Sequence, residues 1–446
     1  MLSVQELKRL VQRGEIDTVL TVFPDMAGRL MGKRMTGKFF VDDVLGHGLH
    51  ACAYLLTVDM EMEPLPGFAM ASWNSGYSDM KAKPDLATLR RIPWLEKTAL
   101  VMCDLITEDG IPVSISPREI LKVQLVRAAK LGYRVKTASE LEFYLYKDTY
   151  EGAGKKHFHD LEPVSTYLED YHILQTTKEE PIIQAIRSGM EGAGIPVENS
   201  KGEWGRGQAE INLRYTDALE MADRHVIYKN GAKEIAFLKG DSITFMAKPH
   251  ADRAGSSCHV HSSLWDKTGK HNLFGANDDL FGHYIAGQIA LGRSLGLWFA
   301  PTINSYKRYQ SGSFAPTRLV CGKDNRTCGL RVIGEGNSKR LENRIPGADA
   351  NPYLAFAATI AAGLHGIERK LKAPTLFTGN AYETPDLAEV PKSLREATDE
   401  FRRDPMLKKI FGAEVIEHYA HAAELEQAAY DQAVTCWELK RYFERI

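Results

Sequence analysis

The stretch SELEFYLY, residues 139–146, decides how this sequence is interpreted. Its mixture of aromatic, aliphatic and polar residues at alternate positions is typical of a β-strand. Side chains of a strand alternate between its two faces, so Glu140 and Glu142 share one face. Two neighbouring carboxylates repel each other unless a cation lies between them. A solvent-exposed edge strand would also tolerate the pair, and this segment alone leaves both alternatives open.

Three further segments repeat the same arrangement. Each combines strand-like residues with acids or histidines at alternate positions, which places the polar groups on one face of the strand. Four separate segments of one chain therefore carry candidate ligands on strand faces. The three segments are GEWGRGQAEINLRY with Glu203 and Glu210, SSCHVHSSL with His259, His261 and Ser263, and RLENR with Glu342 and Arg344.

Acids and a histidine that converge on sheet faces predict a divalent-metal cavity. Each unpaired charge that is buried costs several kcal/mol, and a bound cation removes that cost. Carboxylate oxygens with a single imidazole suit Mg²⁺ or Mn²⁺ better than zinc. A lone histidine is more often an ordinary core residue, and that alternative stays open for His261.

Five arginines lie close in sequence to the candidate ligands. The guanidinium group binds phosphate and carboxylate with two parallel hydrogen bonds, so arginines beside metals indicate phosphoryl transfer onto an acid. Surface ion pairing is the alternative, and it contributes little to stability. The chain has no G-x-x-x-x-G-K-[ST] segment, so we expect no P-loop. The arginines are Arg308, Arg326, Arg331, Arg340 and Arg344.

Composition limits the class of protein. The chain has 446 residues, 44% of them hydrophobic and 26% charged, with a formal net charge of −2. These values are typical of a globular protein with more than one core, and they favour neither a nucleic acid nor a membrane surface as partner. The six cysteines are scattered, so we expect reduced thiols. The first 17 residues form a charged amphipathic segment, and we expect a cytoplasmic protein.

The pattern of predicted helices and strands changes after about residue 105. Before it, DTVLTVFPDMAGRLMGKRM predicts strand, turn and strand, and VMCDLI predicts another strand. From residue 116 onward, long amphipathic segments alternate with short strands. A domain boundary between residues 105 and 115 fits this change. The charged segment after residue 386 has helical periodicity, and we expect solvated helices there.

Six segments together resemble the glutamine synthetase family over nearly the whole chain. They keep the family's order and approximate spacing, so the resemblance is highly specific. It implies an α+β fold with an N-terminal β-grasp domain (residues 1–108) and a catalytic domain (residues 109–446) that has a curved antiparallel sheet and surrounding helices. It also implies active sites shared between subunits of a homo-oligomer, a dodecamer of two hexameric rings. The segments are SELEFYLY, EWGRGQAEI, FMAKPHADRAGSSCHVHSSL, NSYKRYQSGSFAP, NRTCGLRV and LENRIPGADANPYLAF.

The resemblance implies roles for the residues at matching positions. In the family, ATP and two or more Mg²⁺ or Mn²⁺ ions convert the side-chain carboxylate of L-glutamate to an acyl phosphate, from which an amine nitrogen displaces phosphate. The implied metal ligands are Glu142, Glu203 and Glu210 for one ion, and Glu140, His259 and Glu342 for the other. The implied substrate residues are His261, Ser263, Arg326, Arg331 and Arg340 for ATP, and Gly255, Arg308 and Arg344 for glutamate. The expected catalytic residues are Arg326, Asp79 and Glu342.

Two acidic positions of the ammonia-using members differ in this chain. Phe314 replaces the flap glutamate that follows the arginine matching Arg308, and PLPGFAMASWNSGY lacks the acid that precedes the Ser-Asp-Met motif. A less anionic, more apolar nitrogen site favours a carbon-bearing amine. We therefore expect an amine pocket with Phe314, and Asp79 as the base. Within the family the pattern is most similar to the glutamate–methylamine ligases, so methylamine is the expected amine.

Other interpretations of the sequence stay open. An ammonia-dependent glutamine synthetase and a ligase for a larger amine are the nearest ones, and a non-catalytic structural member of the fold is the most distant. Ala254 stands where the family has an asparagine beside the Gly255 loop. A turn or capping role is an alternative for Asp79. Tyr382 lies near a position that is modified in regulated members, and we interpret it as an ordinary surface-loop tyrosine.

Overall fold

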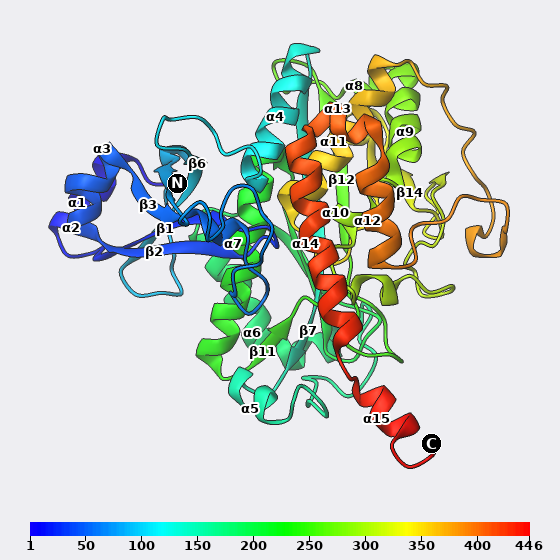
Figure 1. Ribbon diagram of the computed structural model, residues 1–446, viewed down its shortest axis with the longest axis horizontal. Helices are drawn as coiled ribbons and strands as arrows, with labels where there is room; N and C mark the ends of the chain where they lie inside the picture. Colours follow the sequence, from blue (N-terminus) through cyan, green and yellow to red (C-terminus); the bar gives the residue numbers. More distant parts are fainter.

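The computed structural model describes residues 1–446 and contains two β-sheets with helices packed around them (Figure 1). The first sheet has the strand order β2-β1-β6-β4-β3, with β5 paired to β6. Strands β1 and β6 run parallel and the other pairs are antiparallel. The strands are β1 (Thr18–Pro24), β2 (Leu30–Thr36), β3 (Leu49–Cys52), β4 (Asp79–Pro84), β5 (Arg90–Arg91) and β6 (Thr98–Ile106).

The turn between β1 and β2 is held by one carboxylate. Asp25 accepts hydrogen bonds from the backbone N–H groups of Ala27 and Arg29, at 3.0 and 2.8 Å, and from the Arg29 side chain. An aspartate that bonds its own turn in this way stabilises the reversal of the chain. The predicted strand, turn and strand are therefore confirmed.

The second sheet has nine strands in the order β13-β14-β15-β12-β7-β9-β8, with β10 and β11 also paired to β7. Only the β13–β14 pair is parallel. The sheet is curved, and its strands carry most of the candidate ligands. Its strands are β7 (Arg134–Tyr146), β8 (Val197–Gly202), β9 (Gln208–Leu213), β10 (Thr216–Asp217), β11 (Ser242–Thr244), β12 (Cys258–Trp265), β13 (Cys321–Lys323), β14 (Leu330–Ile333) and β15 (Arg340–Asn343).

Helices cover the outer face of the second sheet. The most buried one is α11 (Pro352–Glu368), which packs against α9 and α4 and begins at the capping residue Asn351. The other helices are α1 (Val4–Gln12), α2 (Gly37–Phe39), α3 (Leu45–His47), α4 (Pro117–Lys130), α5 (Tyr150–Lys155), α6 (Ile173–Gly192), α7 (Ala218–Lys239), α8 (Leu273–Ala276), α9 (Asp278–Gly292), α10 (Gly296–Phe299), α12 (Leu394–Arg403), α13 (Pro405–Phe411), α14 (Ala413–Gln432) and α15 (Cys436–Tyr442).

The expected class of fold, mixed helices and sheets with a curved catalytic sheet, is confirmed. The boundary that we predict after residue 108 lies in the loop between β6 and α4, and the division into two domains stays a prediction. One hydrophobic core runs through both sheets. No helix is long and apolar enough to cross a bilayer.

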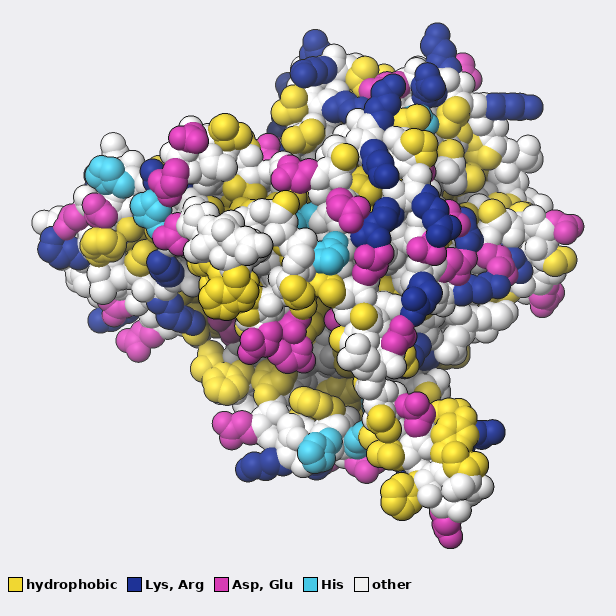
Figure 2. Space-filling model, in the orientation of Figure 1, with side chains coloured by type: hydrophobic (Ala, Val, Ile, Leu, Met, Phe, Trp, Pro, Cys, Tyr) yellow, Lys and Arg dark blue, Asp and Glu magenta, His cyan; other side chains and the backbone are white.

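The segment after residue 386 corrects one expectation. It is helical, but its inner faces are not solvated: Leu394 and Phe401 of α12 and Ile416 of α14 are fully buried. Trp298 of α10 packs against Phe401 with ring centroids 5.1 Å apart. The charged residues cover only the outer faces, as an amphipathic helix requires. Beyond α14 the chain leaves the body, and Figure 2 shows apolar side chains gathered on this C-terminal segment.

Candidate active site

One cluster of carboxylates is built by three neighbouring elements. Glu142 on β7 and Glu210 on β9 are register partners, and Glu203 follows directly after β8. One carboxylate oxygen from each of the three lies within 4.8 Å of the others. The strand alternation found in the sequence and the pairing of β7 with β9 together produce this convergence.

The electrostatics of this first cluster favour a bound cation. Burial and the charges of Glu142 and Glu210 raise the pKa of Glu203 to about 9. Burial and the charges of Glu140 and Glu142 raise the pKa of Glu210 to about 7. Without a cation, therefore, the cluster is ionised only at a cost. An oxygen-only donor set with excess negative charge fits Mg²⁺ or Mn²⁺.

Lys201 belongs to this cluster, and the sequence analysis missed it. It pairs with Glu210 across β8 and β9, and its ammonium group forms an ion pair with Glu203. Burial alone would lower the pKa of Lys201, but the charges of Glu210 and Glu203 outweigh it and raise the pKa. The sequence could have indicated Lys201, because side chains at alternate positions, such as 201 and 203, share one face of a strand.

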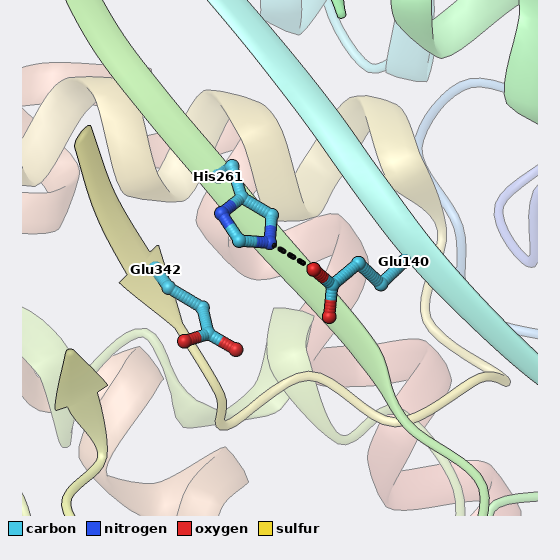
Figure 3. Close-up of side chains that lie close together, drawn as sticks. All are labelled: Glu140, His261 and Glu342. Carbon is cyan, nitrogen blue, oxygen red and sulfur yellow. Dashed lines mark hydrogen bonds and ion pairs between the residues drawn. The ribbon is translucent and has the colours of Figure 1, made fainter. Parts of the chain in front are cut away.

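A second cluster lies on the adjacent strands β7, β12 and β15, and Figure 3 shows three of its side chains. Candidate ligand atoms of Glu140, His261 and Glu342 lie within 4.8 Å of one another. The Nε2 atom of His261 hydrogen-bonds Glu140 at 2.8 Å. His259 also faces this cluster, with its Nδ1 atom 3.0 Å from a Glu140 oxygen and 3.4 Å from a Glu342 oxygen. The structure thus brings both histidines to the second cluster.

The cations around the second cluster differ from those around the first. Glu342 is fully buried, and its two oxygens accept hydrogen bonds from Arg344 at 2.7 Å and Arg331 at 3.1 Å. Burial would raise the pKa of Glu342, but Arg344 and His259 outweigh it and lower the pKa. Burial likewise opposes ionisation of Glu140, whose pKa is nevertheless held well below its ordinary value by His261 and His259. This cluster is therefore ionised and partly neutralised by the chain's own residues.

Two cavities meet at Glu140, which lines both. The larger has a volume of about 700 Å³ and the other about 590 Å³. The larger cavity contains the first cluster, and the other contains His261. The remaining expected substrate residues divide between them: Gly255, Arg308, Arg326, Arg331 and Arg344 line the first, and Ser263 and Arg340 line the second.

The Gly255 position shows why a glycine is required beside Arg308. A Cβ atom at this position would lie 2.7 Å from the Ala247 carbonyl oxygen and 2.7 Å from Cγ of Arg308. Both contacts are closer than carbon side chains tolerate. The glycine therefore lets the buried Arg308 side chain pack against the cavity wall, where it donates to the backbone carbonyls of Arg344 and Ile345.

The two residues expected to form the amine pocket, Phe314 and Asp79, lie in different places. Phe314 lines the larger cavity, and its ring packs edge to face against Trp204, with centroids 5.9 Å apart. Asp79 is exposed at the start of β4 and does not line either cavity of this chain. Tyr382 is half-buried, and its hydroxyl donates to the Ala315 carbonyl at 2.9 Å. Our interpretation of Tyr382 as an ordinary surface residue is therefore incomplete, because it supports the segment that carries Phe314.

Aromatic residues in the second cavity were also missed. Tyr215 and Trp265 stack with centroids 6.4 Å apart, and the ammonium group of Lys136 lies 3.8 Å above the Trp265 ring. Trp265 is buried, whereas Tyr215 is 47% exposed, so the Tyr215 ring and the Lys136 ammonium group are the part of this surface that a planar ring could contact. Trp265 follows Ser263 at an alternate position, so the strand pattern could have identified it.

Comparisons with known proteins agree with this geometry. The family model of the glutamine synthetase catalytic domain matches residues 114–442. The chain is 51% identical to a gamma-glutamylethanolamide synthetase of Streptomyces coelicolor, over 100% of this chain and 96% of that protein. It is 38% identical to a glutamate–isopropylamine ligase of a Pseudomonas species, over 100% and 98% of the two chains.

A solved structure of GmaS, a gamma-glutamylmethylamide synthetase, in complex with ADP superposes on this protein with a TM-score of 0.86 and 28% identity. The match covers 98% of this chain and 99% of that one. The sequence and structural matches extend over both sheets and both cavities. The chain therefore belongs to the glutamine synthetase family and is a ligase that forms carbon–nitrogen bonds.

Proposed function

We propose that this protein uses ATP to join a small primary alkylamine to the γ-carboxyl group of L-glutamate through a γ-glutamyl phosphate. One observation carries the proposal: two carboxylate clusters lie side by side on one face of the curved sheet, where two cavities meet, with arginines on the wall of each cavity. Two separate substrates can thus approach one charged centre. Phosphoryl transfer depends mainly on such positioning and on charge stabilisation.

We assign each substrate to the cavity that its proposed binding residues line. Divalent ions, held by Glu142, Glu203 and Glu210 and by Glu140, Glu342 and a histidine, would neutralise charge on the phosphates. We propose that the chain's own residues do the rest as follows. Arg340, His261 and Ser263 orient ATP in the smaller cavity, Arg326 and Arg331 hold the transferred phosphoryl group, and Arg308, Arg344 and the Gly255 loop hold glutamate.

The amine is proposed to be methylamine. Phe314 supplies an apolar surface where ammonia-using members carry a glutamate, and the structural likeness to GmaS supports the same choice. A protonated alkylamine must lose a proton before its nitrogen can attack, so a base is required. We retain Asp79 for this task, supplied by a neighbouring subunit because it does not line the cavity of its own chain.

Ethanolamine is the second candidate, because of the 51% identity to a gamma-glutamylethanolamide synthetase over the whole chain. Hydroxyl groups of Ser200, Ser313 and Tyr171 line the same cavity as Phe314. A site that hydrogen-bonds a substrate hydroxyl rejects analogues that lack it. The two candidates therefore differ in whether these hydroxyls or the aromatic rings dominate recognition.

The test is phosphate release from ATP and glutamate with methylamine, ethylamine, ethanolamine, isopropylamine or ammonium, at matched low concentrations. We expect a primary alkylamine to give the highest kcat/KM, and mass spectrometry to identify the γ-glutamyl amide. Ammonium turnover equal to or better than that of every amine contradicts the proposal and supports a glutamine synthetase. Phosphate release that needs no divalent ion would contradict the assigned clusters.

We also propose that the protein works as a cytoplasmic homo-oligomer, a dodecamer of two hexameric rings. The C-terminal segment exposes apolar side chains that the monomer leaves uncovered, among them Trp437, Leu439, Phe443 and Ile446. Light scattering during size-exclusion chromatography checks this proposal, and a monomer that is fully active at assay concentrations would contradict it. Because the proposed base comes from a neighbour, dissociation should abolish amide formation.

A further inference from the structure

Two large aromatic rings stand half-exposed inside the larger cavity. Trp204 is 52% exposed and Phe314 is 50% exposed, and their rings meet edge to face at an interplanar angle of 67°. Aromatic rings are a large source of apolar contact area, and a pair left open to solvent in a polar cavity indicates a surface that a ligand covers. We call these two residues the aromatic pair.

The position of Phe314 is fixed by its backbone. Its φ of +60° is uncommon for a bulky residue and persists only where the surroundings impose it. Arg344 donates to the Phe314 carbonyl at 3.3 Å, and the Tyr382 hydroxyl donates to the Ala315 carbonyl at 2.9 Å. The same Arg344 side chain bonds Glu342. The ring is thereby tied to the second carboxylate cluster.

The position of Trp204 is fixed by a tight turn. A Cβ atom at Gly205 would lie 2.1 Å from the Tyr144 hydroxyl, so only glycine fits there. Gly207 has a φ of +72°, and its N–H donates to the buried Glu169 at 3.0 Å. Trp204 directly follows Glu203 of the first cluster. One ring is therefore anchored beside each of the two clusters.

The chemistry of the substrates decides which of them fits against these rings. Glutamate offers carboxylates, for which the arginines of this cavity are suited. The adenine ring of ATP fits the exposed Tyr215 ring of the other cavity. The alkyl part of the amine is the remaining apolar group. Tyr171 and Ile173 also line this cavity, but the aromatic pair is the apolar surface that is anchored beside both carboxylate clusters.

Building on the proposed function, we infer that the aromatic pair holds the alkyl group of the amine and that Trp204 limits the size of amine that is accepted. Trp204 is thus a specificity-determining residue. Phe314 fixes one wall of the amine site, and Trp204 closes it from the side of Glu203. Substituents on the amine that would cross the Trp204 ring are excluded by contact.

The experiment compares wild type with Trp204→Ala, Trp204→Leu and Trp204→Phe over methylamine, ethylamine, isopropylamine and ammonium. For Trp204→Ala we expect kcat/KM for methylamine to fall about 10-fold, since one methyl group in an apolar pocket accounts for a change of that order. Isopropylamine should lose less or gain, so the ratio of the two amines shifts by about 10-fold. Trp204→Phe should restore most of the wild-type ranking, and Trp204→Leu should be intermediate.

Two further measurements separate specificity from a structural effect. The KM values for ATP and glutamate and the Mn²⁺ affinity, followed by electron paramagnetic resonance, should change less than about 2-fold in Trp204→Phe. Phe237→Ala is the matched control, because Phe237 is an exposed aromatic residue of α7 outside both cavities. It should leave the ranking unchanged.

The inference is overturned if Trp204→Ala and Trp204→Leu lose activity by the same factor with every amine, so that the ratio of kcat/KM for methylamine and isopropylamine does not change. Its failure is distinct from failure of the proposed function. The proposed function fails if the wild type prefers ammonium, whereas the inference fails if the wild type ligates amines but Trp204 does not affect their order.

Discussion

The chain gathers carboxylates in two places, and it neutralises them differently. Around Arg118, at the junction of both sheets, Asp223, Asp85 and Asp104 all contact the guanidinium group. Arg118 and Asp223 are each 1% exposed and form a two-point hydrogen bond at 2.9 and 3.0 Å. In the cavity, five glutamates converge with Lys201, Arg331 and Arg344 as their nearest cations.

The pKa values of the acids differ between the Arg118 cluster and the cavity. Burial would raise the pKa of Asp104, but Arg118 and Lys122 outweigh it and lower the pKa. For Glu203 and Glu210, burial and neighbouring carboxylates act in the same direction and raise the pKa. The acids around Arg118 are neutralised within the chain, as Glu140 and Glu342 partly are, whereas Glu203 and Glu210 carry an excess of negative charge that a bound cation would neutralise. Buried acids therefore indicate function where the chain itself leaves them uncompensated.

The largest effect is expected from Arg118→Met, which removes the cation of the compensated group. It leaves Asp223 buried with only the Tyr353 hydroxyl as a partner, 2.6 Å away. Loss of one partner from a buried ion pair costs about 3 to 5 kcal/mol. Urea unfolding measures the change. Lys122→Met is the control, since this half-exposed lysine contacts Asp104 alone and should change stability by less than about 1 kcal/mol. Equal unfolding midpoints for Arg118→Met and wild type would contradict the comparison.

Glu210→Gln tests the uncompensated group. We expect a loss of kcat/KM of at least about 100-fold, because a proposed metal ligand is removed. The free energy of unfolding without metal should stay constant or rise, since like-charge repulsion is relieved. Calorimetric titration with Mn²⁺ checks the site directly. Glu162→Gln, an exposed acid paired with Lys147, serves as the control and should leave both quantities unchanged. A clear loss of stability in Glu210→Gln would place this residue with the Arg118 group.

Glu179 is a buried acid with no cation beside it, and Glu179→Gln tests this third case. Burial and the charge of Glu169 raise the pKa of Glu179 to about 9. Because the folded pKa exceeds the unfolded value of 4.5, this acid's contribution to stability is full below about pH 4.5 and is lost as pH rises toward 9. Relative to wild type, Glu179→Gln should therefore gain about 2 kcal/mol between pH 6 and pH 8.

Thermal unfolding over this pH range measures the gain. Glu180→Gln is the matched control, because its carboxylate pairs with Arg187 at 2.6 Å. It should show no such gain. Parallel pH profiles for Glu179→Gln and wild type would show that Glu179 is ionised in the fold.

The smallest effect is expected from Tyr382→Phe, which removes one neutral hydrogen bond near the cavity. Loss of the bond to the Ala315 carbonyl should cost about 1 kcal/mol. Because that bond supports the segment of Phe314, the amine KM should rise by a few-fold while the KM for ATP stays constant. Steady-state kinetics with methylamine measures both values. A larger change in the KM for ATP would mean that the segment serves the other cavity.

Much of the site could be predicted from the sequence. The shared faces of Glu140 with Glu142, and of His259 with His261, follow from strand periodicity and are present in the structure. The order of motifs implied the family, and the family model confirms it. Lys201 and Trp204 lie within two residues of Glu203 but were not predicted, because neither residue type is a metal ligand and only acids and histidines marked the candidate strands.

The sequence by itself determined which side chains share a strand face and which family the chain belongs to, because both depend on local spacing along the chain. Only the tertiary structure decided which cation each carboxylate meets. Arg118 and Asp223 are 105 residues apart in sequence yet form a buried pair, whereas Lys201 and Glu203 are neighbours. Electrostatic interaction depends on distance and burial in space. Buried carboxylates therefore form ion pairs within the fold around Arg118, and they form a candidate metal site in the cavity.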